Sequence, residues 1–563
     1  MCMVGIAGAQ SLPNNMTQQE IELMKKYHPS SDAMVTTPPT GTPRTQAEWE
    51  ESSGFIMAWT SFNAIQAQII KYGQLEGKVY LFCSDSNAVK TYLTGQSVTP
   101  TSNIKYIYGS FNTIWARDYG PWAIYKNVAD SVSLVDWIYN RPRPQDDQIP
   151  TLLSNYLSIP IYSTTTAPYA LTHTGGNFMT DGNGTGFSSK LVLNENSALS
   201  EAQVDTIMRK FMGIKRYPKM ETLPYDQIHH IDMHIKLLDE ETLLVSQYPA
   251  GVADGPGIEA NLQYILTNFQ TCYGKPYKVV RILAPPGPNG QYPNNGGDYR
   301  TYTNSLIINK TVLVPTYAPQ YDSTALRIYR EAMPGYKIYG IDCNAIIPSL
   351  GAIHCITKEI GVPEPVFISH SGIRTSLPNI TNQVKAYIKT KTGVASARVF
   401  WRTDTLSAYT QVNMTAMPAD TFTANIPSQP AGTKMYYYIS ATSVSGRTIE
   451  KPITAPAGYY KYTYENATSI GNGSTPVSFT LDQNYPNPFN PITTIKYSVP
   501  ASSFITLKVY DMLGKEVASL VNERKDAGNY LINFNGNNFS SGVYYYKLIA
   551  GDYTSVRSMV LVK

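Results

Sequence analysis

The sequence predicts an α/β domain followed by two units built only of β-strands. Between residues 46 and 365, short apolar stretches typical of strands alternate with amphipathic stretches that have helical spacing. Beyond this region, strand-like stretches follow one another with no helical stretch between them. Residues 467–478 are rich in Gly, Ser, Asn and Thr, a composition that favours a flexible linker. A chain of 563 residues is also too long for a single hydrophobic core.

The alternation in the first domain is visible in individual segments. Residues 1–45 precede it and contain one short amphipathic stretch at 21–27. Strands and helices that alternate at this spacing are typical of α/β domains. The strand candidates include 79–82, 243–246 and 306–308, and the helix candidates include 63–72, 202–211, 258–268 and 323–332.

The region 366–466 reads as a small β-sandwich of immunoglobulin-like type, because its apolar stretches are short, closely spaced and free of helical periodicity. Residues 479–563 form a second all-β unit by the same criterion. The strand candidates of the sandwich are 383–389, 397–401, 409–414, 421–426 and 435–442.

Composition and charge exclude several classes of function. Charged residues make up 15% of the chain and the net charge is +4, with no basic run, which argues against a nucleic-acid partner. No apolar run reaches 18 residues, so we expect no membrane span. Five cysteines are too few for a disulfide-stapled fold and leave at least one thiol unpaired within the chain. Residues 1–10 are apolar and small, and resemble the end of a secretory signal peptide without its basic start.

The most informative residues are a cysteine, a histidine and two aspartates. Cys355 follows His354 and a loop of small residues, His230 stands two residues before Asp232, and Asp118 lies in an aromatic segment. A thiolate is a nucleophile, an imidazole moves protons, and paired carboxylates hold a planar fork of N–H donors. These are the groups needed to attack the carbon of a cationic guanidinium group.

Other interpretations of these residues remain open at this point. Cys355 could be a buried, reduced cysteine, or the nucleophile of a Cys-His-Asp protease, although no protease signature surrounds it. If residues 230–234 were a strand, His230, Asp232 and His234 would share one face and could bind a metal ion. Tryptophans such as Trp115 and Trp122 more often belong to a core than to a site, although Trp115 could stack on a guanidinium group. His229, His234 and His354 are expected to have a structural or supporting role.

Several motifs, taken in order, resemble the agmatine deiminase family and its bacterial peptidylarginine deiminase branch over residues 45–360. This resemblance implies the pentein fold, a five-fold pseudosymmetric α/β propeller with the active site at its centre. It also implies hydrolysis of a guanidine to a urea with loss of ammonia, no metal or organic cofactor, and independence from calcium. The motifs are Ala47-Glu-Trp49 with Ala58-Trp59, Trp115-Ala-Arg-Asp118 through Trp122, His173-Thr-Gly-Gly-Asn-Phe178, His229-His-Ile-Asp-Met-His234, Tyr302-Thr-Asn-Ser-Leu306 and His354-Cys355.

The resemblance also assigns a role to each matching residue. Cys355 matches the nucleophile that forms a covalent thiouronium intermediate, and His230 matches the general acid and base. Asp118 and Asp232 match the carboxylates that grip the guanidinium group, and Asn304 matches a polar residue beside the nucleophile. The remaining expected substrate contacts are Trp115, Gly176, Asn177 and Ile228.

Two arginines bear on the choice of substrate. Arg141 and Arg143 match the pair that binds the terminal carboxylate in the peptidylarginine branch. Each precedes a proline, which favours an extended backbone, and alternate residues of an extended segment face the same way. We therefore expect arginine at a peptide C-terminus as the substrate and citrulline as the product. The loop 350–355 resembles that of agmatine deiminases instead, which favours an exported agmatine or free-arginine deiminase as the alternative. A further alternative is an inactive adhesin on the same scaffold.

The last segment resembles the C-terminal sorting domain of type IX secretion cargo. The resemblance rests on Phe479-Thr-Leu-Asp-Gln-Asn-Tyr-Pro-Asn-Pro-Phe-Asn-Pro491, Ser541-Gly-Val-Tyr-Tyr-Tyr546 and Met559-Val-Leu-Val-Lys563. It implies Sec export, the type IX machinery as a partner, and a secreted or cell-surface location in a Bacteroidetes-like bacterium. The alternative is a carbohydrate-binding or adhesive β-sandwich. The expected divisions are 1–45, 46–365, 366–466, 467–478 and 479–563.

Overall fold

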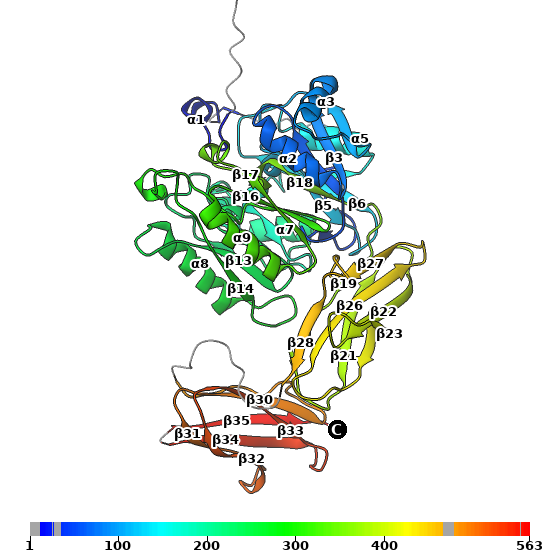
Figure 1. The fold of residues 1–563 in the computed structure, drawn as a ribbon, viewed down its shortest axis with the longest axis vertical. Helices are drawn as coiled ribbons and strands as arrows, with labels where there is room; N and C mark the ends of the chain where they lie inside the picture. Colours follow the sequence, from blue (N-terminus) through cyan, green and yellow to red (C-terminus); the bar gives the residue numbers. More distant parts are fainter. Residues whose placement is uncertain (1–11, 25, 28–34, 466–477, 552) are drawn as a thin grey trace, which may run out of the picture.

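The computed structural model describes residues 12–24, 26–27, 35–465, 478–551 and 553–563. Figure 1 shows an α/β domain in blue to green, a β-sandwich in yellow below it, and a second β-unit in orange and red. The possible signal-peptide remnant at 1–10 lies outside the described residues, as does nearly all of the linker 467–478. Among the described cysteines, Cys83, Cys272, Cys343 and Cys355 are free. No helix among the described residues is long and apolar enough to cross a membrane.

The described part of the α/β domain contains five small sheets with one shared pairing pattern. In each sheet, one strand pairs antiparallel with a neighbour on one side and parallel with a neighbour on the other. The strand orders are β1(Arg44–Thr45)-β5(Trp122–Tyr125)-β6(Val132–Tyr139)-β7(Ile161–Thr164) with β8(Thr172–His173) on β6; β11(Lys219–Met220)-β10(Gly186–Ser189)-β9(Met179–Thr180); β12(Ile235–Leu237)-β13(Thr242–Gln247)-β14(Lys278–Leu283); β15(Leu306–Ile308)-β16(Thr311–Thr316)-β17(Lys337–Asp342); and β18(Lys358–Gly361)-β2(Ser52–Ala58)-β3(Lys78–Cys83)-β4(Ile104–Tyr108).

Helices lie around these sheets (Figure 1). In α7 the residues Val204, Ile207, Met208 and Phe211 recur at helical spacing and are buried, which explains why this segment forms an amphipathic helix. A capping box at Ser200 begins it, and Gly213 in the left-handed region ends it. The helices are α1(Gln18–Met24), α2(Asn63–Gly73), α3(Ser86–Gly95), α4(Ala116–Tyr119), α5(Ile149–Leu157), α6(Leu191–Asn194), α7(Glu201–Met212), α8(Asp254–Asn268) and α9(Pro319–Ala332).

The second domain is a sandwich of two sheets, and the expected strands within 366–466 are present. Its core is formed by apolar side chains that alternate along the strands, as in β21, where Val384, Ala386 and Ile388 are buried. The sheets are β19(Phe367–Ser369)-β21(Asn382–Lys389)-β25(Thr421–Ile426)-β24(Thr415–Met417), and β20(Thr375–Ser376)-β28(Tyr460–Tyr464)-β26(Lys434–Ser443)-β22(Val394–Arg402)-β23(Thr410–Asn413) with β27(Thr448–Lys451) on β26.

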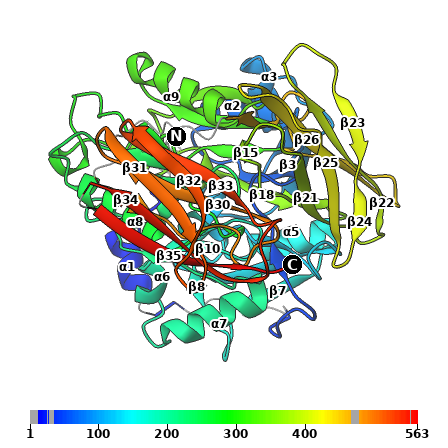
Figure 2. The same ribbon diagram turned by 90° about the horizontal axis from the view of Figure 1, so that it is seen from below.

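The third unit is also all-β (Figure 2), and its buried apolar side chains form a separate hydrophobic core. Ile505, Leu507 and Val509 alternate inward along one strand, as expected for a strand with one buried face. Its sheets are β29(Thr480–Leu481)-β30(Ile492–Val499)-β33(Gly528–Asn535) and β32(Glu516–Lys525)-β31(Ser503–Tyr510)-β34(Gly542–Ala550)-β35(Tyr553–Leu561).

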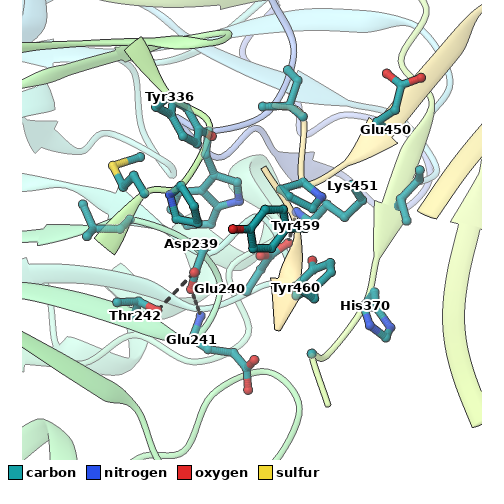
Figure 3. A pocket seen from close by; sticks show the side chains of 18 of the residues that line it. Asp239, Glu240, Glu241, Thr242, Tyr336, His370, Glu450, Lys451, Tyr459 and Tyr460 are labelled. Atoms are coloured by element: carbon teal, nitrogen blue, oxygen red, sulfur yellow. Dashed lines mark hydrogen bonds and ion pairs between the residues drawn. The ribbon is translucent and has the colours of Figure 1, made fainter. Parts of the chain in front are cut away.

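Polar contacts join the sandwich to the α/β domain. Lys451 pairs with Glu240 at 2.6 Å, and Arg374 pairs with Glu241 at 2.9 Å. Between the two domains lies a cavity of about 680 Å³, lined by carboxylates and aromatic rings that include Glu450, Tyr336 and Tyr460 (Figure 3). Because most of its charged groups are paired, this cavity is best described as part of the interface.

Candidate active site

The five expected catalytic residues lie together although they come from different parts of the α/β domain. Asp118 belongs to α4, Asp232 to a 3-10 turn at Ile231–Met233, and Cys355 to another at His354–Ile356. His230 directly precedes the first of these turns, and Asn304 stands two residues before β15. All five side chains are at most 2% exposed, so water is largely excluded from them.

Asn304 shapes the loop that carries Cys355. Its Oδ1 accepts hydrogen bonds from the backbone N–H groups of Ala352 at 3.1 Å, His354 at 3.1 Å and Cys355 at 3.3 Å. Its Nδ2 donates to Cys355 Sγ at 3.1 Å. The side chain therefore fixes the loop and supplies a donor that favours a negative charge on the sulfur.

A glycine lets this loop close around the sulfur. A Cβ at Gly351 would stand 2.9 Å from Cys355 Cβ and 2.5 Å from a ring carbon of Trp115. Both distances are shorter than real Cβ contacts, so only glycine fits here without displacing the cysteine or the indole ring.

A chain of charged groups supports Asp232. His354 Nδ1 lies 2.7 Å from Asp232 Oδ2, and His354 Nε2 lies 3.3 Å from Glu48 Oε2. Lys236 in turn donates to Glu48 at 2.8 Å. Burial by itself would raise the pKa of Asp232, but the hydrogen bond and charge of His354 lower it. Asp232 is therefore held as a carboxylate, 3.7 Å from Cys355 Sγ.

Asp118 has a different environment. Burial, followed by the negative charge of Asp232, raises the pKa of Asp118 to about 7. The N–H of Gly176 donates to its Oδ1 at 3.2 Å, and a Cβ at that glycine would stand 2.5 Å from His230 Nδ1. The two aspartates thus combine one firmly ionised carboxylate with one that titrates near neutral pH.

His230 is held by Thr174, whose Oγ1 lies 2.9 Å from His230 Nε2. Burial lowers the pKa of His230 to about 3, so the ring is neutral near pH 7. Its Nδ1 lies 3.6 Å from Asp118 Oδ1, beyond good hydrogen-bond distance.

Three buried polar atoms in this cluster have no hydrogen-bond partner: Asp118 Oδ2, Asp232 Oδ1 and His230 Nδ1. Buried acceptors without partners cost free energy, and such groups mark places where a ligand completes the hydrogen bonding. One unsatisfied oxygen on each of two carboxylates suits a planar cation with several N–H donors.

The buried site keeps the Cys355 thiol protonated when it is empty. Burial and the negative charges of Asp232 and Asp118 raise its pKa well above the ordinary value. A cation bound between the carboxylates would offset those charges and lower the thiol pKa. In this arrangement, a bound cation would favour the thiolate form of Cys355.

The other expected contacts differ in position. Trp115 is fully buried beside the Cys355 loop, and its indole N–H donates to the carbonyl of Leu12 at 3.0 Å. Asn177 accepts a hydrogen bond from the N–H of Ser189 at 2.9 Å and leaves its Nδ2 without a partner. Ile228 is buried in the core of the domain, where its backbone N–H donates to Asp226.

Arg141 and Arg143 are buried near the cluster, but they do not belong to an extended segment. The N–H of Arg143 donates to the carbonyl of Arg141 at 2.8 Å, so the chain turns there and the expected extended geometry is wrong. The guanidinium groups converge nevertheless, because Arg141 donates to Asn14 O at 3.0 Å and Arg143 to Pro13 O at 2.8 Å. Arg143 also pairs with Glu20 at 2.7 Å.

The strand that the metal interpretation of residues 230–234 assumed is not formed. Ile231–Met233 form a 3-10 turn, so His230, Asp232 and His234 do not share one face of a strand. Within the described part of the chain, no three His, Cys, Asp or Glu side chains are placed to hold a metal ion.

Several supporting residues escaped the sequence analysis. Thr174 positions His230, and Glu48 supports Asp232 through His354, for which a supporting role was already an open interpretation. Thr174 and Glu48 lie within two of the family motifs given above, so their polar side chains could have been recognised there as candidate supporting residues. Glu20 and Asn14 carried no such signal, because their contacts to the site join residues more than 120 positions apart.

Comparison with known proteins identifies the family. A model described as Porphyromonas-type peptidyl-arginine deiminase matches residues 44–361, more than half of the chain. The chain belongs to this deiminase family. The resemblance indicated by the sequence motifs is thereby confirmed. A second model, described as a secretion system C-terminal sorting domain, matches residues 483–563.

Relatives of this deiminase carry more than one named activity. A protein of Mycoplasma capricolum subsp. capricolum named "Putative agmatine deiminase" is 26% identical over 288 residues, covering 46% of this chain and 77% of the relative. The solved structure of an agmatine deiminase of Enterococcus faecalis matches with a TM-score of 0.50 at 20% identity, over 58% of this chain and 99% of that one. The solved structure of the "Putative Arginine Deiminase" from Porphyromonas gingivalis also gives 0.50, at 21% identity, over 57% and 98%.

At these identities the solved structures establish a deiminase-type fold for the first domain and leave the substrate open. Family membership places the protein among arginine and agmatine deiminases, which hydrolyse C–N bonds of guanidinium groups.

Proposed function

We propose that this deiminase converts arginine at the C-terminus of a peptide to citrulline and ammonia. Asp118 and Asp232 would bind the guanidinium group, because each presents an unsatisfied buried oxygen. Cys355 would attack the guanidinium carbon, and Asn304 would stabilise the thiolate from 3.1 Å.

His230 would move the protons in this scheme. When Cys355 attacks, the proton of its thiol would pass to His230 and then to the departing ammonia, and a covalent thiouronium would remain. His230, neutral again, then takes a proton from the water that hydrolyses the thiouronium, releasing the urea product and the thiol. Its unsatisfied Nδ1 is the atom available for these transfers, because Nε2 faces Thr174.

The observation that carries the choice of substrate is the pair Arg141 and Arg143 beside a site for a cation. Burial raises the pKa of Asp118 and lowers that of His230, and in both groups the positive charge of Arg141 acts to lower the pKa. The guanidinium group of Arg141 therefore acts on the catalytic cluster. Arg141 and Arg143 are two buried cations beside the place where the guanidinium group of the substrate would bind. They would repel that group unless the substrate also carries an anion. The carboxylate of a C-terminal arginine supplies that anion at a short distance from the guanidinium group.

Replacing either arginine by methionine tests this assignment. Arg141→Met or Arg143→Met is expected to raise KM for a peptide ending in arginine by roughly 10- to 100-fold, the effect of losing a charge-assisted hydrogen bond. Citrulline release is measured for that peptide, its C-terminal amide, a peptide with internal arginine, and agmatine. The C-terminal amide serves as the control, because it lacks the carboxylate. An equal loss on the peptide and its amide would contradict the assignment.

The pH profile gives an independent test of the carboxylate pair. Asp118 must be ionised to bind a guanidinium group, and its pKa of about 7 means that it is largely protonated below that pH. We therefore expect kcat/KM to rise with pH through about 7, because this parameter reports ionisation of the free enzyme. Steady-state assays between pH 5.5 and 8.5 measure it. A flat profile across pH 6 to 8 would show that Asp118 does not limit binding.

A second candidate is deimination of agmatine, which has no carboxylate. One observation favours it: Glu20 already neutralises Arg143, so the anion that the site requires is supplied from within the chain. Under this alternative, agmatine is the best substrate in the panel above, and the two arginine variants show no larger loss on the free C-terminal peptide than on its amide.

The remaining domains fit an exported enzyme. The sorting domain at 483–563 supports secretion or surface location through the type IX machinery of a Bacteroidetes-like bacterium. We assign the five sheets to the blades of a pentein propeller and the sandwich to an immunoglobulin-like domain. Both assignments rest on the pairing pattern and strand order described above. The partners in this scheme are arginine-bearing peptides and proteins and the secretion machinery.

A further inference from the structure

Residues 12–24 cover the part of the candidate site that contains Arg141 and Arg143. This segment, called the strap below, ends in α1, which lies on the side of the α/β domain away from the β-sandwich (Figure 1). The family model begins only at residue 44, so the strap lies outside the matched region.

The strap occupies the guanidinium group of Arg143. Glu20 accepts from Nε at 2.7 Å and from Nη2 at 3.3 Å, which is the two-point geometry of a bound carboxylate. Nη2 also donates to the carbonyls of Pro13 at 2.8 Å and Asn15 at 3.3 Å, and Nη1 faces the Tyr139 hydroxyl at 3.5 Å. A substrate carboxylate could therefore reach this fork only by replacing Glu20.

The strap also contacts the loop that carries the nucleophile. Asn14 is fully buried, and its backbone N–H donates to Ser349 O at 3.0 Å while its side chain donates to Leu350 O at 3.4 Å. The carbonyl of Leu12 receives the indole N–H of Trp115 at 3.0 Å. The strap thus bridges the two arginines and the loop before Cys355.

Few apolar contacts anchor the strap. Within α1 the only buried residue is Glu20, whereas Ile21 is 40% exposed and Leu23 is 53% exposed. Segments with little buried apolar surface open at a lower free energy than the rest of a domain. The one buried side chain of α1 is thus the one whose contact with Arg143 a competing carboxylate would replace.

We propose that the strap is a built-in ligand of the carboxylate subsite, and that Glu20 determines how strongly a substrate with a free carboxylate must compete for Arg143. This inference rests on the proposed function, because it requires Arg143 to receive the substrate's carboxylate. Displacement of the strap then precedes binding of a peptide that ends in arginine, and is not needed for a substrate without a carboxylate.

Glu20→Gln in the full chain separates the ion pair from the fold of the strap. Thr17 and Glu20 form a reciprocal capping box: Thr17 N–H donates to Glu20 Oε2 at 2.8 Å, and Glu20 N–H donates to Thr17 Oγ1 at 3.3 Å. Glutamine also serves at this position of a capping box, so the variant keeps the helix start and loses the charge.

We expect Glu20→Gln to lower KM for the free C-terminal arginine peptide by about tenfold, which corresponds to a strap that fills the subsite about nine-tenths of the time. The value of kcat should not change, and KM for the amidated peptide should stay within twofold. In an Arg143→Met background the same replacement should have no further effect, since the two residues act on each other.

The outcomes separate this inference from the proposed function. The strap inference is overturned if the unmodified protein and the Glu20→Gln variant deiminate the free C-terminal peptide with the same KM. The proposed function is unaffected by that result. An equal fall in KM for the amidated peptide also overturns the strap inference. If the unmodified protein and the Glu20→Gln variant both act on agmatine but release no citrulline from any peptide, the proposed function is wrong. The strap inference, which rests on it, is then wrong as well.

Hydrogen exchange supplies a second readout that does not depend on turnover. In full-length Cys355→Ala protein, the free C-terminal arginine peptide should increase exchange at residues 12–24, whereas agmatine should not. Unchanged exchange at saturating peptide would overturn displacement of the strap.

Discussion

Cys355→Ser is expected to lower kcat for the best substrate by roughly 10⁴-fold or more, because removing a covalent nucleophile leaves only binding and electrostatic effects. Serine fits the space of the thiol, which Asn304 and the loop around Gly351 enclose. Its hydroxyl is a far weaker nucleophile, and the bound guanidinium group cannot bring its pKa into the neutral range. Citrulline release under single-turnover and steady-state conditions measures the effect.

A second buried cysteine of the same domain gives the matched control. Cys343 is fully buried and free, and burial raises the pKa of its thiol as it does for Cys355. Cys343→Ser changes the same atom in the same domain, so it should keep kcat within a few-fold. Activity of Cys355→Ser within tenfold of the unmodified protein would exclude a thiolate mechanism.

Asp118→Asn is expected to lower kcat/KM by roughly 10³-fold and, at pH 8, to stabilise the protein. The loss follows from removing one carboxylate of the pair that binds the cation. The gain follows because the folded-state pKa of Asp118 is raised to about 7 from an unfolded value near 4, so its ionised form opposes folding. This penalty grows between about pH 4 and 7 and is complete above 7.

Thermal unfolding at pH 5 and pH 8 checks the sign, since the gain from Asp118→Asn should be larger at pH 8. Asp146→Asn is the control, because burial also raises its pKa, to about 6, but its oxygens accept hydrogen bonds from Asn112 and Thr113. Replacing Asp146 should lower the unfolding temperature. A destabilised Asp118→Asn protein would mean that Asp118 is structurally satisfied in the empty site.

Much of the secondary structure could be predicted because it depends on local pattern. The helical spacing of Val204, Ile207 and Phe211 matches the period of α7, and the alternation of Val384, Ala386 and Ile388 matches β21. Near β19, the sequence changes from alternating strand and helix patterns to strand patterns alone, which is where the sandwich was expected to begin.

Contacts between distant residues could not be predicted in the same way. Glu20 meets Arg143 across 123 positions and His354 meets Asp232 across 122, and no local pattern encodes such pairs. The turn at Arg141 was missed because proline restrains the residue before it without setting the direction of the following chain. The five candidate catalytic residues were found through family motifs, which carry long-range information that periodicity lacks.

The ion pairs between the first two domains have a consequence for the smallest unit that can fold. Glu240 and Glu241 belong to the α/β domain and are each 5% exposed, and their cationic partners Lys451 and Arg374 belong to the sandwich. Cutting the chain at the domain boundary would remove both ion pairs, although Glu241 would keep Lys278 of its own domain 4.0 Å away. We therefore expect the α/β domain cut from the sandwich to unfold at a lower temperature than the same domain in the full chain.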